Sequence, residues 1–151
     1  MAQAYISLGS GFGSKAENIN RAVWQIAADK RIKVQKVSGI YEAKKHELGK
    51  APAYFAAIRI ETSLSPEEIA KNLREVEENL GKNNISLELL MVEGVVSDSE
   101  ALPLPNPKIE ECPHIICPLL NLYADKRLKE LLKELGEENV KYTGAGLYLP
   151  L

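Results

Sequence analysis

The order of periodic segments in the first 96 residues constrains the fold of this chain more than any other sequence feature. Apolar residues alternate with neighbouring positions from Ala4 to Leu8, which predicts a strand that ends at the glycine-rich turn 9–13. A helix is predicted next, because Ser14 and Glu17 have the spacing of a capping box. Its apolar face is formed by Ile19, Ala22, Val23 and Ile26.

Two further strands and a second helix follow. Residues 32–41 and 54–62 are rich in β-branched and aromatic residues, and the connection between them is too short for a packed helix, so we expect antiparallel neighbours. The run Ser65-Pro66-Glu67-Glu68 has a cap, a proline at the first helical position and a carboxylate at the third, and Gly81 is a helix stop. Residues 87–96 are apolar enough to predict a central fourth strand.

This order predicts an α+β, ferredoxin-like (βαββαβ) sandwich, with one antiparallel sheet and both helices on one face. A proline-rich loop is expected at 102–118, and a C-terminal helix between Asp125, its cap, and Gly136, its stop. The buried side of that helix is predicted to contain Leu128, Leu131, Leu132 and Leu135. Residues 142–151 are expected to add an edge strand.

Length and composition favour one domain, residues 1–151. The 151 residues are 45% hydrophobic, which is enough for one contiguous core without disulfides. Nineteen basic residues oppose 21 acidic ones, and no run of like charge stands out, so nucleic acid is not an expected partner. No apolar run is long enough to span a membrane, and we expect a cytoplasmic protein without a signal peptide.

Several segments in sequence resemble the hydroxymethyl-dihydropterin pyrophosphokinase family. The matching segments run from the opening Ala4-Tyr5-Ile6-Ser7-Leu8-Gly9-Ser10, through 37–41, 61–68 and the region of Val76 to Lys82, to Cys117-Pro118-Leu119. The resemblance covers roughly residues 4–122. It implies the same ferredoxin-like core, and an enzyme that transfers pyrophosphate from ATP to a pterin alcohol in folate synthesis, with Mg and ATP as its cofactors.

The metal-binding motif of that family is missing. The family has L-D-x-D on its fourth strand, and the two aspartates bind two magnesium ions along the ATP phosphates. Alignment on Gly94 places Leu87 and Leu89 at these positions, and a shift of one residue recovers only Glu88. Since magnesium prefers oxygen ligands and phosphoryl transfer depends on neutralised phosphate charge, this loss is severe.

Other positions that the resemblance implies are only partly kept. Gly9, Ser10, Tyr54 and Glu77 match substrate-binding positions, and Glu88 and Lys82 are the remaining catalytic candidates, with Glu88 also a metal candidate. The family histidine, arginine and pterin-stacking aromatic correspond to Asn106, Cys112 and His114, and Arg74 stands where a nucleotide-contacting glutamine is usual. The basic arm that closes over ATP is cut to the few residues between Lys82 and Leu87.

Three other clusters have simpler explanations. The turn 9–13 suggests a dinucleotide cradle, but no crossover helix fits after the second strand, so a glycine-permissive turn is favoured. Cys112, His114 and Cys117 could contribute to a zinc or redox site, but a fourth ligand is absent nearby, so inert thiols are favoured. A loose acidic group around the fourth strand and its exit could bind a divalent ion by an altered route, but acidic residues at strand ends are usually just solvated. Its members are Glu88, Glu93, Asp98 and Glu100.

The leading hypothesis is a pseudoenzyme: a pyrophosphokinase-like protein that has lost transfer from ATP to the pterin and acts as a binding or regulatory module. Its expected partner is a small molecule, a pterin or a nucleotide, and a homodimer through an exposed sheet edge is a second hypothesis. The alternative is an active pyrophosphokinase with a rewired ATP and magnesium site. A third hypothesis, of another class, is a Cys/His metal or redox module.

Overall fold

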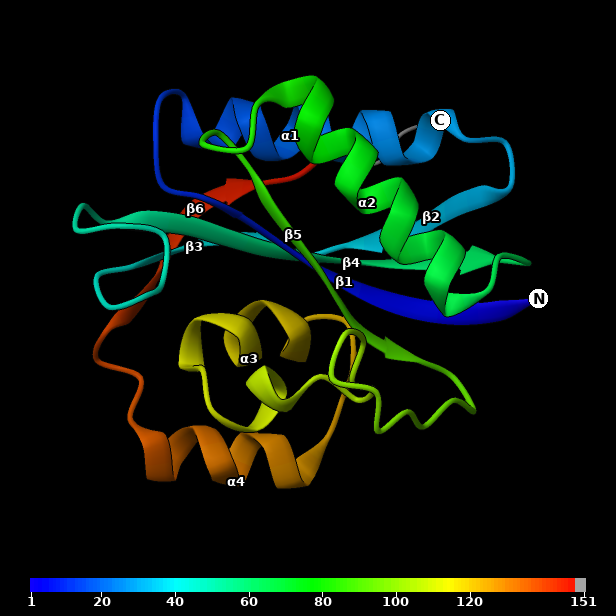
Figure 1. The fold of residues 1–151 in the computed structure, drawn as a ribbon. Coiled ribbons are helices and arrows are strands. Elements are labelled where there is room, and N and C mark those ends of the chain that lie inside the picture. The colour runs from blue at the N-terminus through cyan, green and yellow to red at the C-terminus, as the bar shows by residue number, and fades with distance from the viewer. Residues whose placement is uncertain (149–151) are drawn as a thin grey trace.

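A six-stranded antiparallel sheet forms the centre of the molecule in the computed structural model, which describes residues 1–148 (Figure 1). The strand order is β5-β1-β4-β3-β6, and β2 pairs with β4 next to β3. The strands are β1 (Ala2–Ser10), β2 (Ile32–Val37), β3 (Gly39–Ala43), β4 (Ala53–Thr62), β5 (Ser86–Val92) and β6 (Val140–Gly146).

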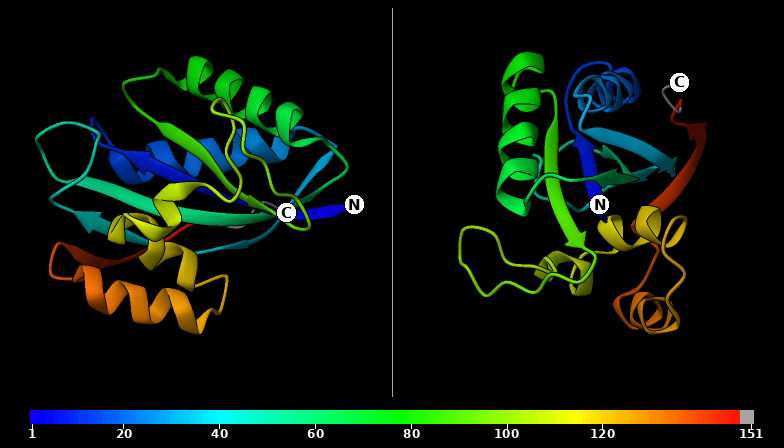
Figure 2. Two further views of the ribbon diagram at one scale, coloured as in Figure 1. Left: turned by 60° about the horizontal axis from the view of Figure 1, so that its bottom comes forward. Right: turned by 90° about the vertical axis from the view of Figure 1, so that its right-hand side faces the viewer.

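Helices cover both faces of this sheet. The two longer helices, α1 (Lys15–Ala28) and α2 (Pro66–Leu80), lie side by side on one face, and α3 (Pro113–Leu120) and α4 (Lys126–Leu135) lie on the other (Figures 1 and 2). A short 3-10 helix, η1 (Pro107–Glu110), precedes α3. The ferredoxin-like expectation is therefore confirmed for the βαββαβ core, and the C-terminal helices add a layer to its second face.

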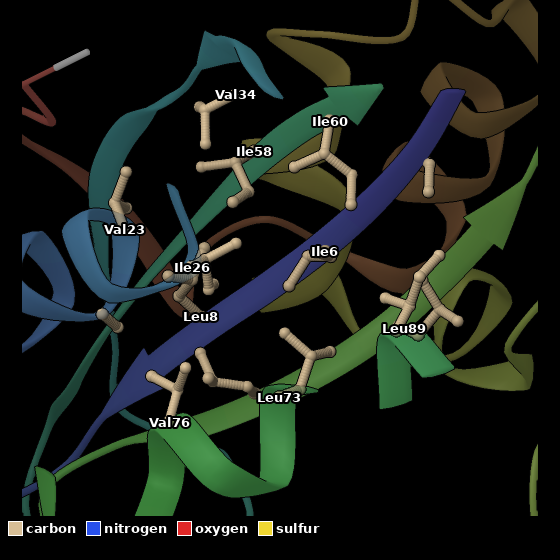
Figure 3. Packing of buried hydrophobic residues seen from close by; sticks show 14 of the residues in the cluster. Ile6, Leu8, Val23, Ile26, Val34, Ile58, Ile60, Leu73, Val76 and Leu89 are labelled. Atoms are coloured by element: carbon tan, nitrogen blue, oxygen red, sulfur yellow. The ribbon is translucent and has the colours of Figure 1, made fainter. Parts of the chain in front are cut away.

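Alternation along the central strands divides the core into two parts. Even-numbered residues of β1 and β4 face α1 and α2, where Ile6, Leu8, Ile58 and Ile60 pack with Leu73 and other apolar residues of the helices (Figure 3). Odd-numbered residues such as Tyr5 and Ala57 face α3 and α4. Because β1 and β4 are buried on both sides, they form the rigid platform for the surrounding loops.

Most predicted elements are present, with shifted boundaries. The Ser65 capping box and the Gly81 stop of α2 are confirmed, and the apolar face predicted for α1 is fully buried. The strand expected at 32–41 is two strands, because Ser38 interrupts it and its hydroxyl accepts a hydrogen bond from Ala57 N at 2.8 Å. β2 and β3 then pair with successive parts of β4, as the antiparallel prediction requires.

Four predictions about local structure were wrong. Ser14 forms no side-chain cap, and Glu17 instead pairs with Arg21 at 2.8 Å. The strand at 87–96 is β5, which ends at Val92 and lies at the edge of the sheet rather than in its centre. The expected loop 102–118 contains η1 and most of α3. Leu135 is 42% exposed rather than buried, because Leu128 and Leu132, with the partly buried Leu131, form the packed side of α4.

The C-terminal edge strand is confirmed in part. β6 pairs with β3 and begins at Val140, two residues earlier than predicted, and residues 149–151 of the predicted strand lie outside the described part of the chain. Within residues 1–148, none of the helices combines the length and the apolar character that a membrane crossing needs.

Candidate functional site

Leu87 and Leu89 of β5 belong to the apolar core. They lie opposite Leu8 and Ile6 of β1, respectively, and are only 7% and 4% exposed. Leu89 points toward the face of the sheet that α1 and α2 cover, among the side chains of α2 and β1 (Figure 3). The two positions that the resemblance assigns to metal-binding aspartates therefore carry apolar side chains, and these are packed as core residues are.

Glu88 points to the opposite face of the sheet and begins a network of four polar side chains. Its Oε1 accepts a hydrogen bond from Lys108 Nζ at 2.7 Å, and the same ammonium lies 3.7 Å from Glu47 Oε1. Glu47 Oε2 in turn accepts from His114 Nε2 at 2.9 Å. The Glu88–Lys108–Glu47–His114 network thereby joins β5, η1, the β3–β4 loop and α3.

Within this network, the pKa values of Glu47 and Lys108 are shifted in the directions that favour their ionised forms. The hydrogen bond from His114, helped by Lys108, lowers the pKa of Glu47 from 4.5 to about 2. Partial burial alone would lower the pKa of Lys108, but its contacts with Glu88 and Glu47 outweigh burial and raise it. The carboxylate of Glu88 is therefore already paired with an ammonium, which would repel a cation that approached it.

Phe55 fills the space beside His114. Its side chain is 2% exposed, and the Phe55 and His114 ring centroids lie 4.5 Å apart. A flat ring inserted between two others needs a separation of about 7 Å, because each pair of stacked rings lies about 3.5 Å apart. His46 covers another side of Phe55, at 5.8 Å between centroids, and its ring accepts a hydrogen bond from Leu48 N. No ligand ring fits between Phe55 and His114 in this arrangement.

Two of the predicted substrate-binding residues lie at the end of β1. They are Gly9 and Ser10. Gly9 lines a cavity of about 240 Å³ together with Lys82, a catalytic candidate, so the fold brings Gly9 and Lys82 together. Ser10 is fully buried, and its hydroxyl donates to the Asn84 carbonyl at 2.6 Å while accepting from Asn18 Nδ2 at 3.2 Å. The Ser10 hydroxyl therefore holds the loop before β5 rather than facing a cavity.

Tyr54 and Glu77 lie apart from that cavity. Tyr54 follows strand alternation and points away from the His114 side, with Lys15 Nζ 5.5 Å from its ring centroid. Glu77 Oε2 accepts a hydrogen bond from Leu87 N at 2.8 Å, so this carboxylate satisfies the open edge of β5. Lys82 is 74% exposed and lies 4.0 Å from Glu78.

A cleft of about 470 Å³ lies between α2, the edge of β5 and the loop that leads to η1. Its apolar lining includes Leu73, Leu87, Leu89 and Leu102. Arg74, Glu88, Lys108 and Glu111 contribute charged groups. This cleft, which we call the α2–β5 cleft, is where the sheet edge with the two leucines meets the Glu88–Lys108–Glu47–His114 network.

The residues at β5 do not fit a magnesium ion. Leucine side chains supply no ligand, and among residues 1–148 no three His, Cys, Asp or Glu side chains converge as a metal site. This holds for Cys112, His114 and Cys117 as well. Burial raises the pKa of both thiols, that of Cys117 to about 11, so each stays protonated at neutral pH.

Comparison with known proteins identifies the family. The sequence profile of 7,8-dihydro-6-hydroxymethylpterin-pyrophosphokinase (HPPK) matches residues 5–124. The chain belongs to the HPPK family. Among curated relatives, the folic acid synthesis protein fol1 of Pneumocystis carinii is 32% identical over 130 residues, 80% of this chain and 17% of its own length.

A second relative is the 2-amino-4-hydroxy-6-hydroxymethyldihydropteridine pyrophosphokinase of Bacillus subtilis. It is 26% identical over 91% of this chain and 88% of its own length. A crystal structure of an HPPK-DHPS protein in complex with substrates superposes with a TM-score of 0.74 at 9% identity, over 94% of this chain and 48% of that one. The chain thus spans about a fifth of the first curated HPPK relatives, fol1 of P. carinii (17%) and of Schizosaccharomyces pombe (21%).

Three residues of this site were missed by sequence reasoning. Glu47 and Lys108 lie in connections without periodicity, and Phe55 reads as an ordinary apolar strand residue. Their importance comes from contacts between segments far apart in the sequence, such as Glu47 with His114. The only available signal was Glu88, a carboxylate in an otherwise apolar strand, which predicts a basic partner across the fold.

Proposed function

We propose that this HPPK family member does not transfer pyrophosphate and acts as a small-molecule binding module. One observation carries the proposal: Leu87 and Leu89 are packed in the core where carboxylates would have to face the metal ions. Phosphoryl transfer depends almost wholly on positioning and on neutralising phosphate charge. Apolar side chains do neither.

The one carboxylate of β5 does not compensate for these leucines. Glu88 lies on the other face of the sheet and is hydrogen-bonded to Lys108 at 2.7 Å. Glu77 is occupied by the backbone of Leu87. A rewired metal site built from these two would therefore have to break two existing interactions and turn one side chain around the sheet edge.

The packing around His114 supports the same conclusion from the pterin side. The resemblance assigns to His114 the position of the aromatic that stacks on the pterin, and Phe55 occupies the space in front of its ring. A pterin could enter only after Phe55 and the loop residues that cover it had moved.

The test is a direct assay. The protein is incubated with ATP, magnesium and hydroxymethyl-dihydropterin, with the B. subtilis pyrophosphokinase as the positive control, and AMP is quantified by chromatography. We expect no AMP above the level without protein. Sustained AMP formation that scales with the protein concentration would overturn the proposal.

A second candidate is an active pyrophosphokinase with a rewired site that uses Glu88, Glu77 and Lys82. It is favoured by the similarity to a named pyrophosphokinase over 91% of this chain. This candidate predicts ATP binding that depends on magnesium. Calorimetry that detects no ATP binding with or without magnesium would remove it.

Three narrower expectations stay predictions. A zinc or redox role for Cys112, His114 and Cys117 predicts bound metal in purified protein, and elemental analysis measures this directly. A homodimer through the edge of the sheet predicts twice the chain mass in light scattering. A cytoplasmic location predicts recovery with the cytosolic fraction.

A further inference from the structure

We infer that the α2–β5 cleft binds a small amphipathic mono-anion, that is, an apolar body with one negatively charged group. This inference rests on the proposed function, since it names the class of ligand that such a binding module would take. Its basis is the combination of apolar lining, fixed walls and one available guanidinium in the same cleft.

The size and lining of the cleft suit an apolar body. Its volume of about 470 Å³ lies within the range of roughly 300–1,000 Å³ that is usual for small-molecule sites. Leu73 comes from α2, Leu87 and Leu89 from β5, and Leu102 and Pro103 from the loop. A ligand placed there would cover the edges of core leucines that water now reaches.

The loop wall is fixed by backbone hydrogen bonds. Ser97 and Leu104 exchange a pair of bonds at 2.8 and 3.0 Å, and Asn106 N donates to Leu90 O at 2.8 Å. The Asn106 side chain also donates to Leu89 O. Since these bonds tie the loop to itself and to β5, the cleft is formed before any ligand arrives.

The charges in the cleft favour a single negative group. Arg74 is exposed and takes part in no ion pair with the residues that the structure describes, whereas Lys108 already has Glu88 and Glu47 as partners. A guanidinium binds carboxylate and sulfonate groups well because it offers several donors in one plane. Glu88 and Glu111 on the same cleft would repel further negative charge, so a polyanion such as a triphosphate is disfavoured.

Two fluorescent probes that differ by one charged group test this inference. The first is 8-anilinonaphthalene-1-sulfonate, and the second is N-phenyl-1-naphthylamine, which has the same apolar body without the sulfonate. We expect saturable binding of one sulfonate probe per chain, about two- to fivefold tighter than that of the neutral probe, in proportion to one partly exposed ion pair.

Substitutions in α2 locate the probe. Arg74→Gln should weaken sulfonate binding about two- to fivefold and leave the binding of the neutral probe unchanged. Ala70 lines the same cleft, so Ala70→Glu should weaken sulfonate binding while Ala70→Lys, of similar length and opposite charge, should strengthen it. Lys71→Gln is the matched control, because Lys71 is exposed on the same helix and does not line the cleft.

The outcomes separate this inference from the proposed function. Equal affinity for both probes, no saturable binding, or an Arg74→Gln variant that binds like the parent would overturn the ligand class. Each of these results leaves the proposal on catalysis standing if AMP is not formed. AMP formation would overturn the proposed function even if the sulfonate probe binds. Circular dichroism of each variant checks that the fold is kept.

Discussion

Glu47 connects the β3–β4 loop to α3 through the hydrogen bond that it accepts from His114. Its pKa in the folded protein is about 2, below the ordinary value of 4.5, so its ionised form stabilises the fold. This contribution is complete above pH 4.5 and is lost as the pH falls toward 2. Because the side chain is 41% exposed, solvent screening reduces the contribution to about 1 kcal/mol.

We therefore expect Glu47→Gln to lower the free energy of unfolding by about 1 kcal/mol at pH 7, and the difference from the parent protein to vanish near pH 2. Urea titrations across this range measure it. Glu100→Gln, a change at an exposed loop position, is the control. A difference that stays constant with pH would show that Glu47 acts through packing rather than through its charge.

Gly9 lies where a side chain would collide with Phe55. A Cβ atom at this position would be 2.7 Å from Phe55 Cε1 and 2.9 Å from Leu48 Cδ1. Because the Phe55 side chain is buried and its ring packs beside His46 and His114, it cannot give way freely. We expect Gly9→Ala to lower the free energy of unfolding by about 1–3 kcal/mol. Gly146→Ala is the matched control in another strand, since nothing lies within 4 Å of its Cβ position.

The cause can be isolated with a second substitution. Phe55→Leu shortens the side chain that Gly9→Ala would meet, so the double variant should be more stable than the sum of the single changes, by about 0.5 kcal/mol or more. Chemical denaturation of the four proteins gives this coupling energy. Strict additivity would mean that the collision is relieved elsewhere.

The helices α1 and α2 begin with the same sequence pattern but not with the same structure. Ser65 Oγ accepts from Glu68 N at 3.2 Å, and Glu68 Oε1 accepts from Ser65 N at 3.0 Å. Ser14 makes no such bond. We expect Ser65→Ala to destabilise the protein by about 1 kcal/mol and Ser14→Ala to change it by a few tenths at most, in thermal or urea unfolding. Equal effects would mean that Ser14 forms its cap in solution.

Local sequence signals predicted the elements whose stability is local. The cap, the proline and the glycine stop of α2 act within a few residues, and all of them were found. The position of β5 in the sheet and the helix α3 depend on distant contacts instead. In α3, Pro118 interrupts the residue pattern that is typical of a helix. The helix is also buried against the sheet and α4, so it has no polar face, and its sequence lacks the alternation of polar and apolar residues that predicts a helix.

At the scale of the whole molecule, sequence reasoning located the altered positions but not what replaces them. The loss of two carboxylates at 87 and 89 follows from alignment alone. That Lys108 neutralises Glu88, that Glu47 reaches His114 and that Phe55 fills the adjacent space follow only from tertiary packing. These contacts join segments 20 to 67 residues apart, where pattern analysis has no information.

The layered fold also predicts an order of local opening. β1 is hydrogen-bonded to β4 on one side and to β5 on the other, and Ala4, Ile6 and Leu8 are fully buried, so its amides should exchange with solvent only when the whole domain unfolds. β6 is an edge strand whose only partner strand among residues 1–148 is β3, and its residues 141–146 are exposed. The Asn139 side chain accepts hydrogen bonds from Lys44 N and Lys45 N just before β6 begins. At the far end, Leu147 is buried and Tyr148 N donates to Asn20 Oδ1, so β6 is anchored at its two ends while its length stays exposed.

We therefore expect native-state hydrogen exchange to give opening free energies for β6 at least about 2 kcal/mol below those for β1. Exchange measured by NMR in low urea concentrations tests this, because global opening depends on urea and local opening does not. If β6 amides exchanged as slowly as those of β1, with the same urea dependence, the C-terminal strand would belong to the cooperative core.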